Sequence, residues 1–140
     1  MKPFIFKTDE IYFECALDYP VEIVKGDSGT GKTYIYKVID IYATERSLKG
    51  KYECSYPLER VKILLNAFSV NQLQSLNGYI IFIDRGDMLL TPELIDYINK
   101  DSQNYYVITA RNIDGLNVFI NAVKEMHYKV KDNKISLVIN

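Results

Sequence analysis

The sequence predicts an α/β fold with a mainly parallel sheet, and three observations support this. Apolar stretches of strand length alternate along the chain with stretches of helical periodicity. Residues 79–84, "YIIFID", are almost continuously apolar, which is typical of a strand buried on both faces of a parallel sheet. The 140 residues suffice for one domain, 1–140, and are too few for two.

The first half of the chain contains three predicted strands and one long helix. Residues 4–7 and 10–17 predict a hairpin around a polar turn. Residues 21–25, "VEIVK", predict a strand that leads into a glycine-rich loop. Residues 32–46 place apolar side chains at helical spacing, so they predict a helix with one buried face that ends near Gly50.

The middle of the chain is less regular, although its helix signals are clear. Residues 52–56 and 60–66 each fit a strand, and residues 69–76 fit a short helix capped by Ser69. The following helix, at residues 91–100, is well marked. Thr91 is its predicted N-cap, Pro92 occupies its first turn, and Glu93 lies at the positive end of its dipole.

The last third predicts a buried strand, a helix and a hairpin. Residues 105–111, "YYVITAR", predict the strand, and residues 116–126, "LNVFINAVKEM", predict the helix. Residues 127–140 predict a hairpin that turns at Asp132 and Asn133.

Composition excludes little beyond a membrane span. The formal net charge of −1 gives no overall preference for nucleic acid or an anionic membrane. No apolar run reaches the roughly 18 residues that a membrane-spanning helix needs, so we expect a cytoplasmic protein.

Residues 26–33, "GDSGTGKT", fit the pattern GxxxxGK[ST] at every fixed position. Glycines let successive backbone N–H groups turn toward a phosphate, and the helix that follows adds its positive N-terminal end. The lysine neutralises phosphate oxygens, and the threonine hydroxyl takes one position on Mg²⁺. The predicted nucleotide-binding residues are Gly26, Asp27, Ser28, Gly29, Thr30, Gly31, Lys32 and Thr33.

With this loop, the chain resembles the P-loop NTPases. The extra Gly29, giving GxxGxGKT, resembles the ATPase and small-molecule kinase branches, and the order of elements through about residue 111 is most similar to small AAA/STAND-like ATPases. The resemblance implies a three-layer fold with a mainly parallel sheet, flanked here by short N- and C-terminal hairpins. It also implies ATP and Mg²⁺ as ligands.

Asp84, at the end of "YIIFID", resembles the Walker B aspartate, which would hold Mg²⁺ together with Thr33. Many ATPases of this class carry a glutamate next that activates the attacking water. Here Arg85, Gly86 and Asp87 follow, which argues against fast hydrolysis. Asp87 is a candidate base if the turn at Gly86 directs it inward; the alternative is a helix-capping or solvent-facing aspartate.

The strand "YYVITAR" ends with two further candidates. Thr109 resembles the sensor 1 residue that positions water against the γ-phosphate, and Arg111 would either bind phosphate or pair with an aspartate of the site. The predicted catalytic residues are Lys32, Asp84, Asp87, Thr109 and Arg111.

These residues predict Mg-ATP binding with slow hydrolysis, in a switch or in a subunit of a larger assembly. The guanine-reading pattern NKxD is not matched by "NKDS" at residues 99–102, so ATP is expected rather than GTP. No arginine finger is evident within the chain, so self-association or a protein partner would have to supply one. Two alternatives stay open: a nucleoside- or nucleotide-like kinase, suggested by "IDR" at residues 83–85, and a nucleotide-binding module with negligible turnover.

Overall fold

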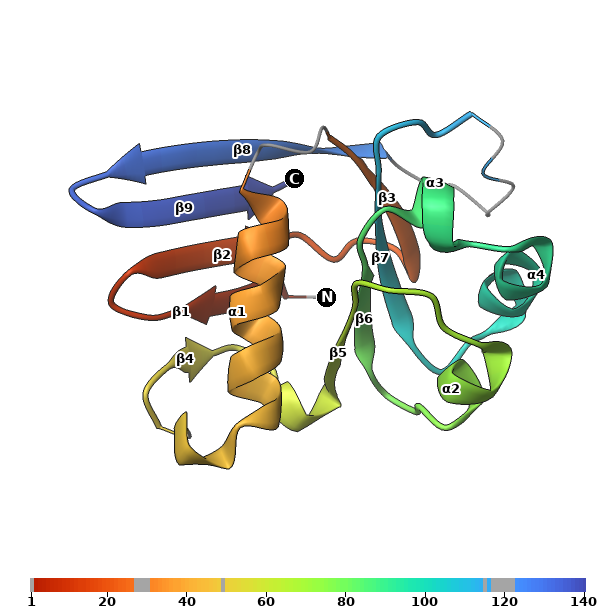
Figure 1. Cartoon of the computed structure of the whole chain (residues 1–140), viewed down its shortest axis with the longest axis horizontal. Coiled ribbons are helices and arrows are strands. Elements are labelled where there is room, and N and C mark those ends of the chain that lie inside the picture. The colour runs from red at the N-terminus through yellow and green to blue at the C-terminus, as the bar shows by residue number, and fades with distance from the viewer. Residues whose placement is uncertain (1, 27–30, 49, 115, 117–122) are drawn as a thin grey trace.

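The computed structural model of the chain describes residues 2–26, 31–48, 50–114, 116 and 123–140. They form a mixed α/β fold with one large sheet and few helices (Figure 1). The strands are β1 (Phe4–Lys7), β2 (Ile11–Cys15), β3 (Val21–Lys25), β4 (Glu53–Cys54), β5 (Val61–Leu64), β6 (Ile80–Ile83), β7 (Tyr105–Ala110), β8 (Val123–Lys131) and β9 (Lys134–Ile139). The helices are α1 (Lys32–Thr44), α2 (Val70–Gln74), α3 (Gly86–Leu89) and α4 (Pro92–Lys100), with short 3-10 turns at Arg46–Leu48 and Leu58–Arg60.

The sheet is mixed, with the strand order β4-β1-β2-β9-β8-β3-β7-β6-β5. Neighbours within β8-β3-β7-β6-β5 are all parallel, whereas β1 is antiparallel to both β2 and β4, and β8 is antiparallel to β9. The expected mainly parallel sheet is therefore not what the whole sheet shows: uninterrupted parallel pairing is found in this block of five strands, and the sheet as a whole is mixed. The terminal hairpins do not flank the sheet as predicted; they join it, because β2 pairs in parallel with β9.

The prediction of a helix at residues 116–126 is wrong for the part of this segment that the structure describes. Residues 123–126 belong to β8, and residues 117–122 lie outside the described part. This segment pairs with β3 on one edge and with β9 on the other. Backbone N–H and C=O groups that would otherwise lack partners are hydrogen-bonded in this way, so the segment is a strand. The predicted turn is confirmed: Asp132 and Asn133 have φ values of 51° and 61°, the left-handed conformation that tight two-residue hairpin turns require.

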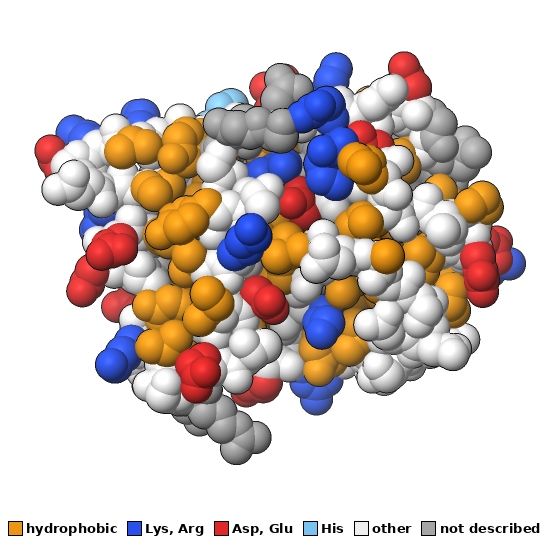
Figure 2. All heavy atoms as spheres, viewed as in Figure 1, with side chains coloured by type: hydrophobic (Ala, Val, Ile, Leu, Met, Phe, Trp, Pro, Cys, Tyr) orange, Lys and Arg blue, Asp and Glu red, His pale blue; other side chains and the backbone are white. Residues whose placement is uncertain are grey.

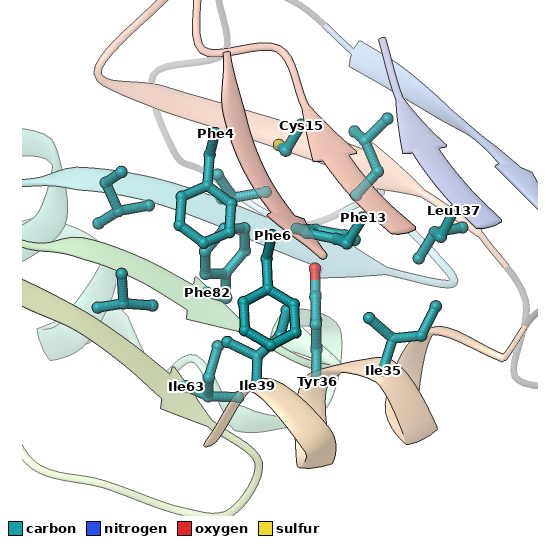
Figure 3. Close-up of a cluster of buried hydrophobic side chains, with 14 of the residues drawn as sticks. Phe4, Phe6, Phe13, Cys15, Ile35, Tyr36, Ile39, Ile63, Phe82 and Leu137 are labelled. Carbon is teal, nitrogen blue, oxygen red and sulfur yellow. The ribbon is translucent and has the colours of Figure 1, made fainter. Parts of the chain in front are cut away.

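An aromatic cluster shows that the sheet curls around α1 (Figure 3). The ring centroid of Phe4 in β1 lies 5.4 Å from that of Phe82 in β6, although five strands separate β1 from β6 in the sheet order. Tyr36 of α1 lies between Phe82, at 5.5 Å, and Phe13 of β2, at 6.1 Å. The N-terminal hairpin thus supplies part of the apolar surface that buries α1.

A second cluster covers the other face of the parallel block. Ile81 and Ile83 of β6 pack there with Leu94 and Ile98 of α4, whereas Phe82 between them belongs to the cluster around α1. Because successive side chains of a strand point to opposite faces, α1 lies on one face of this block and α4 on the other. None of the helices in the described residues is both long and apolar enough to cross a membrane.

Thr91 caps α4 as predicted, since its Oγ1 accepts the backbone N–H of Leu94 at 3.2 Å and Pro92 opens the helix. A Thr91→Ala variant is expected to lower the free energy of unfolding by about 1 kcal/mol, because that N–H loses its acceptor. Thr91→Ser, which keeps the hydroxyl, is the matched control. Urea unfolding checks this, and an unchanged midpoint in Thr91→Ala would contradict the capping role.

Candidate functional site

The structure brings together three of the predicted site residues. Lys32 Nζ lies 3.0 Å from Asp84 Oδ1, and the Thr33 hydroxyl donates a hydrogen bond of 2.9 Å to Asp84 Oδ2. Lys32 and Thr33 open α1, and Asp84 directly follows β6, 51 residues after Thr33. One carboxylate therefore contacts both side chains that the loop motif assigns to phosphate and Mg²⁺.

The backbone around the glycine loop explains the position of Lys32. The N–H of Gly26 donates to the carbonyl of Ala110 at 3.1 Å, which fixes the start of the loop beside the end of β7. Gly31 has φ 80° and precedes α1, and its carbonyl accepts from the N–H of Ile35 at 3.1 Å. A side chain at Gly31 would be strained by this φ. The other loop residues of the prediction, Asp27, Ser28, Gly29 and Thr30, lie outside the described residues.

Asp84 reaches the site because of strand alternation. Phe82 faces α1, so Asp84, two residues later, is directed to the same face. The backbone N–H of Asp84 donates to the carbonyl of Leu64 at 3.0 Å, which anchors the end of β6 to β5. The carboxylate is thereby held near the N-terminal end of α1, where the helix dipole favours negative charge.

The Lys32–Asp84 contact is buried and incompletely satisfied. The side chain of Lys32 is 1% exposed and that of Asp84 is 7% exposed. Although the two atoms lie within ion-pair distance, neither Lys32 Nζ nor Asp84 Oδ1 makes a hydrogen bond of good geometry within the described part of the chain. The same holds for Glu22 Oε1, which lies 3.3 Å from Lys124 Nζ, so this feature is shared by two buried ion pairs of the fold.

The donor set fits a phosphate with Mg²⁺. Lys32 offers an ammonium, and Thr33 and Asp84 offer the hydroxyl and carboxylate oxygens that Mg²⁺ prefers. The described residues contain no group of three or more His, Cys, Asp or Glu side chains that could hold a metal by themselves. Mg²⁺ characteristically uses one or two protein ligands, with water and substrate phosphates completing its shell, so this small set is sufficient.

Thr109 lies on β7, between the strand before the loop and the strand before Asp84. Its Oγ1 is 2.9 Å from the hydroxyl of Tyr36, and both residues are fully buried. Burial raises the pKa of Tyr36 far above its ordinary value, so this phenol stays protonated. Sequence reasoning missed Tyr36; its position four residues after Lys32, on the same helix face, was the available indication.

A Tyr36→Phe variant is expected to lower the free energy of unfolding by about 1–3 kcal/mol, because the buried Thr109 hydroxyl loses its partner. The double variant Tyr36→Phe/Thr109→Val removes both polar groups and should recover most of this loss. Chemical denaturation of the two variants and the wild type checks this. Equal stability of Tyr36→Phe and wild type would show that the bond contributes nothing.

Asp87 is held by residues at the end of the sheet. Its Oδ1 lies 3.4 Å from Arg85 Nε, and its Oδ2 accepts the backbone N–H of Asn112 at 3.3 Å. The turn at Gly86 packs closely on β7, since a Cβ there would lie 2.3 Å from Ile108 Cγ2. Both carboxylate oxygens of Asp87 are thus engaged by neighbouring groups, and Asp87 lies inside α3 (Gly86–Leu89), not at its N-cap, which is Arg85. Arg111 is exposed just after β7.

Two side chains of β8 pack against the glycines of the loop, which sequence reasoning did not predict. A Cβ on Gly26 would lie 1.5 Å from Met126 Cε, and one on Gly31 would lie 2.4 Å from Tyr128 Cε2. Met126, Tyr128 and Val130 alternate with polar residues along β8, and this period of two could have indicated a strand.

No protein-family model matches this chain, and no curated protein matches it. The function of the chain is therefore inferred from the loop motif and from the geometry around Asp84.

Proposed function

We propose that the chain is a small P-loop ATPase domain that binds Mg-ATP at the start of α1 and hydrolyses it slowly, as a switch or as a subunit of a larger assembly. The observation that carries this proposal is the Asp84 carboxylate, which contacts both Lys32 and Thr33. A strand-end aspartate alone would be weak support. Its contact with both the lysine and the threonine of the loop motif supports the proposal.

The strand order supports the same proposal. The carboxyl ends of the parallel strands β3, β6 and β7 meet at one edge, where ligands bind in such sheets. β7, which carries Thr109, lies between β3 and β6, and in this proposal Thr109 would be the sensor residue. In this proposal, β8-β3-β7-β6-β5 with helices on its two faces is the three-layer P-loop core, and the remaining strands are additions to it.

The chain's own residues would act mainly by binding and charge compensation. Lys32 would neutralise β- and γ-phosphate oxygens, while Thr33 and Asp84 would hold Mg²⁺. Lys32 would exchange its contact with Asp84 for a phosphate, which frees the carboxylate for the metal. Bound Mg-ATP supplies the phosphoryl group for in-line attack by water.

Slow turnover is the expected consequence of the residues after Asp84. No glutamate follows it, and Asp87 is engaged by Arg85 and Asn112. An arginine finger is worth about 10³–10⁵ in rate, so a second copy or another protein would have to supply one for fast hydrolysis. The same bonds of Asp87 favour, as second candidate, a cytoplasmic nucleotide-binding module with negligible turnover.

Phosphate release from Mg-ATP by the purified protein, measured beside binding on the same sample, tests the proposal. We expect saturable binding with slow release, and a release rate per molecule that rises with protein concentration if a second copy completes the site. Fast release at high dilution would contradict the slow mechanism. ADP formation only on addition of a nucleoside or nucleotide acceptor would instead establish the kinase alternative.

A further inference from the structure

Tyr128 is an exposed aromatic residue placed directly against the loop. Figure 1 shows β8 passing the start of α1, and the Tyr128 ring packs on Gly31, the residue before Lys32. The residue is nevertheless 41% exposed, so part of the ring remains open to solvent. Hydrophobic side chains are exposed over much of the face formed by α1 and the β8–β9 hairpin (Figure 2).

The burial of Lys32 and Asp84 constrains how the phosphates and the base of a bound nucleotide would lie. The terminal phosphate belongs with Lys32 and Asp84, whose side chains are 1% and 7% exposed. A base linked to that phosphate would extend from these buried groups toward solvent. Exposed large aromatic residues in the described part of the chain are Tyr19, Tyr34 and Tyr128. Of these, Tyr128 is the one whose ring lies nearest to Gly31, the residue before Lys32.

We propose that Tyr128 stacks on the base of the bound nucleotide, so that the C-terminal hairpin forms the outer wall of the site. This inference rests on the proposed function. Stacking uses the flat face that every base presents, so it supplies affinity without reading hydrogen-bonding groups. Tyr128 would therefore strengthen the binding of Mg-ATP and Mg-GTP to similar extents and contribute nothing to the binding of inorganic tripolyphosphate.

Isothermal titration of wild type and variants with Mg-ATP, Mg-GTP and Mg-tripolyphosphate tests this. Tyr128→Ala is expected to weaken both nucleotides by about 5- to 150-fold and to leave tripolyphosphate binding unchanged. Tyr128→Phe should retain nucleotide affinity. Tyr19→Ala is the matched control, since Tyr19 is 42% exposed and precedes β3 at the end away from the loop.

The other possible results of these titrations separate a failure of the stacking proposal from a failure of the proposed function. Equal losses for nucleotides and tripolyphosphate in Tyr128→Ala would overturn the proposal, because the ring would then merely position Gly31. Unchanged nucleotide affinity in Tyr128→Ala would overturn it as well. If wild type binds neither nucleotide nor tripolyphosphate, the proposed function itself fails. If wild type binds both and only the Tyr128 result differs from expectation, only the stacking proposal fails.

Discussion

A Lys32→Ala variant is expected to lose Mg-ATP binding, with affinity falling by at least about 30-fold. Lys32 is the one cation within the described site that is buried against Asp84, and truncating a buried charged partner costs about 2–5 kcal/mol or more in binding. Isothermal titration with Mg-ATP measures the change. Unchanged affinity in this variant would remove the phosphate-binding role of the loop.

Two controls separate lost binding from lost folding. Removing Lys32 leaves the Asp84 carboxylate buried without its cation, which destabilises the protein before any ligand is added. Lys32→Met/Asp84→Asn removes both charges, so it should recover stability while remaining unable to bind. Lys25→Ala is the matched lysine control, since Lys25 is exposed at the end of β3; it should bind Mg-ATP nearly as wild type does.

A Lys124→Met variant is expected to lose about 3–5 kcal/mol of unfolding free energy. Glu22 of β3 is fully buried, and its Oε1 lies 3.3 Å from Lys124 Nζ, which also contacts Asp18. Without Lys124, the Glu22 carboxylate would be buried without a cation. The double variant Lys124→Met/Glu22→Gln should regain most of the loss, because it removes the unpaired charge. Failure of the double variant to regain stability would show that Lys124 acts through packing instead.

The pH dependence of this variant follows from Glu22. Burial raises the pKa of Glu22, and Lys124 opposes that rise. A carboxyl whose pKa is raised on folding binds its proton more tightly in the folded state, so its contribution to stability falls as pH rises from the unfolded pKa through the folded one. Lys124→Met raises the folded pKa further. Its penalty should therefore be larger at about pH 7 than at about pH 5, and equal urea-unfolding penalties at both would contradict this account.

The sequence was most informative where function or local geometry restricts residue choice. The loop motif and the apolar strand before Asp84 predicted a contact across 51 residues, and Thr91 with Pro92 predicted the start of α4. In both cases a few residues carry the whole signal, because a phosphate loop and a helix cap each demand particular side chains at fixed spacing.

Features that depend on distant pairing could not be predicted in this way. Val123 and Met126 are three residues apart, a spacing that suits a helix, and pairing with β3 and β9 makes this segment a strand. The curl of the sheet depends on the pairing of β2 with β9, which no local pattern encodes. Tyr128 was missed for the same reason, since its contact with Gly31 exists only once β8 lies beside β3.

Isothermal titration of the wild-type protein with ATP, once in excess Mg²⁺ and once in EDTA, tests the central claim most directly. If Lys32, Thr33 and Asp84 form a Mg-nucleotide site, one saturable binding event is expected in Mg²⁺. Binding should be clearly weaker in EDTA, where Asp84 faces the phosphates without a cation between them. Absence of saturable ATP binding in Mg²⁺ would contradict the claim.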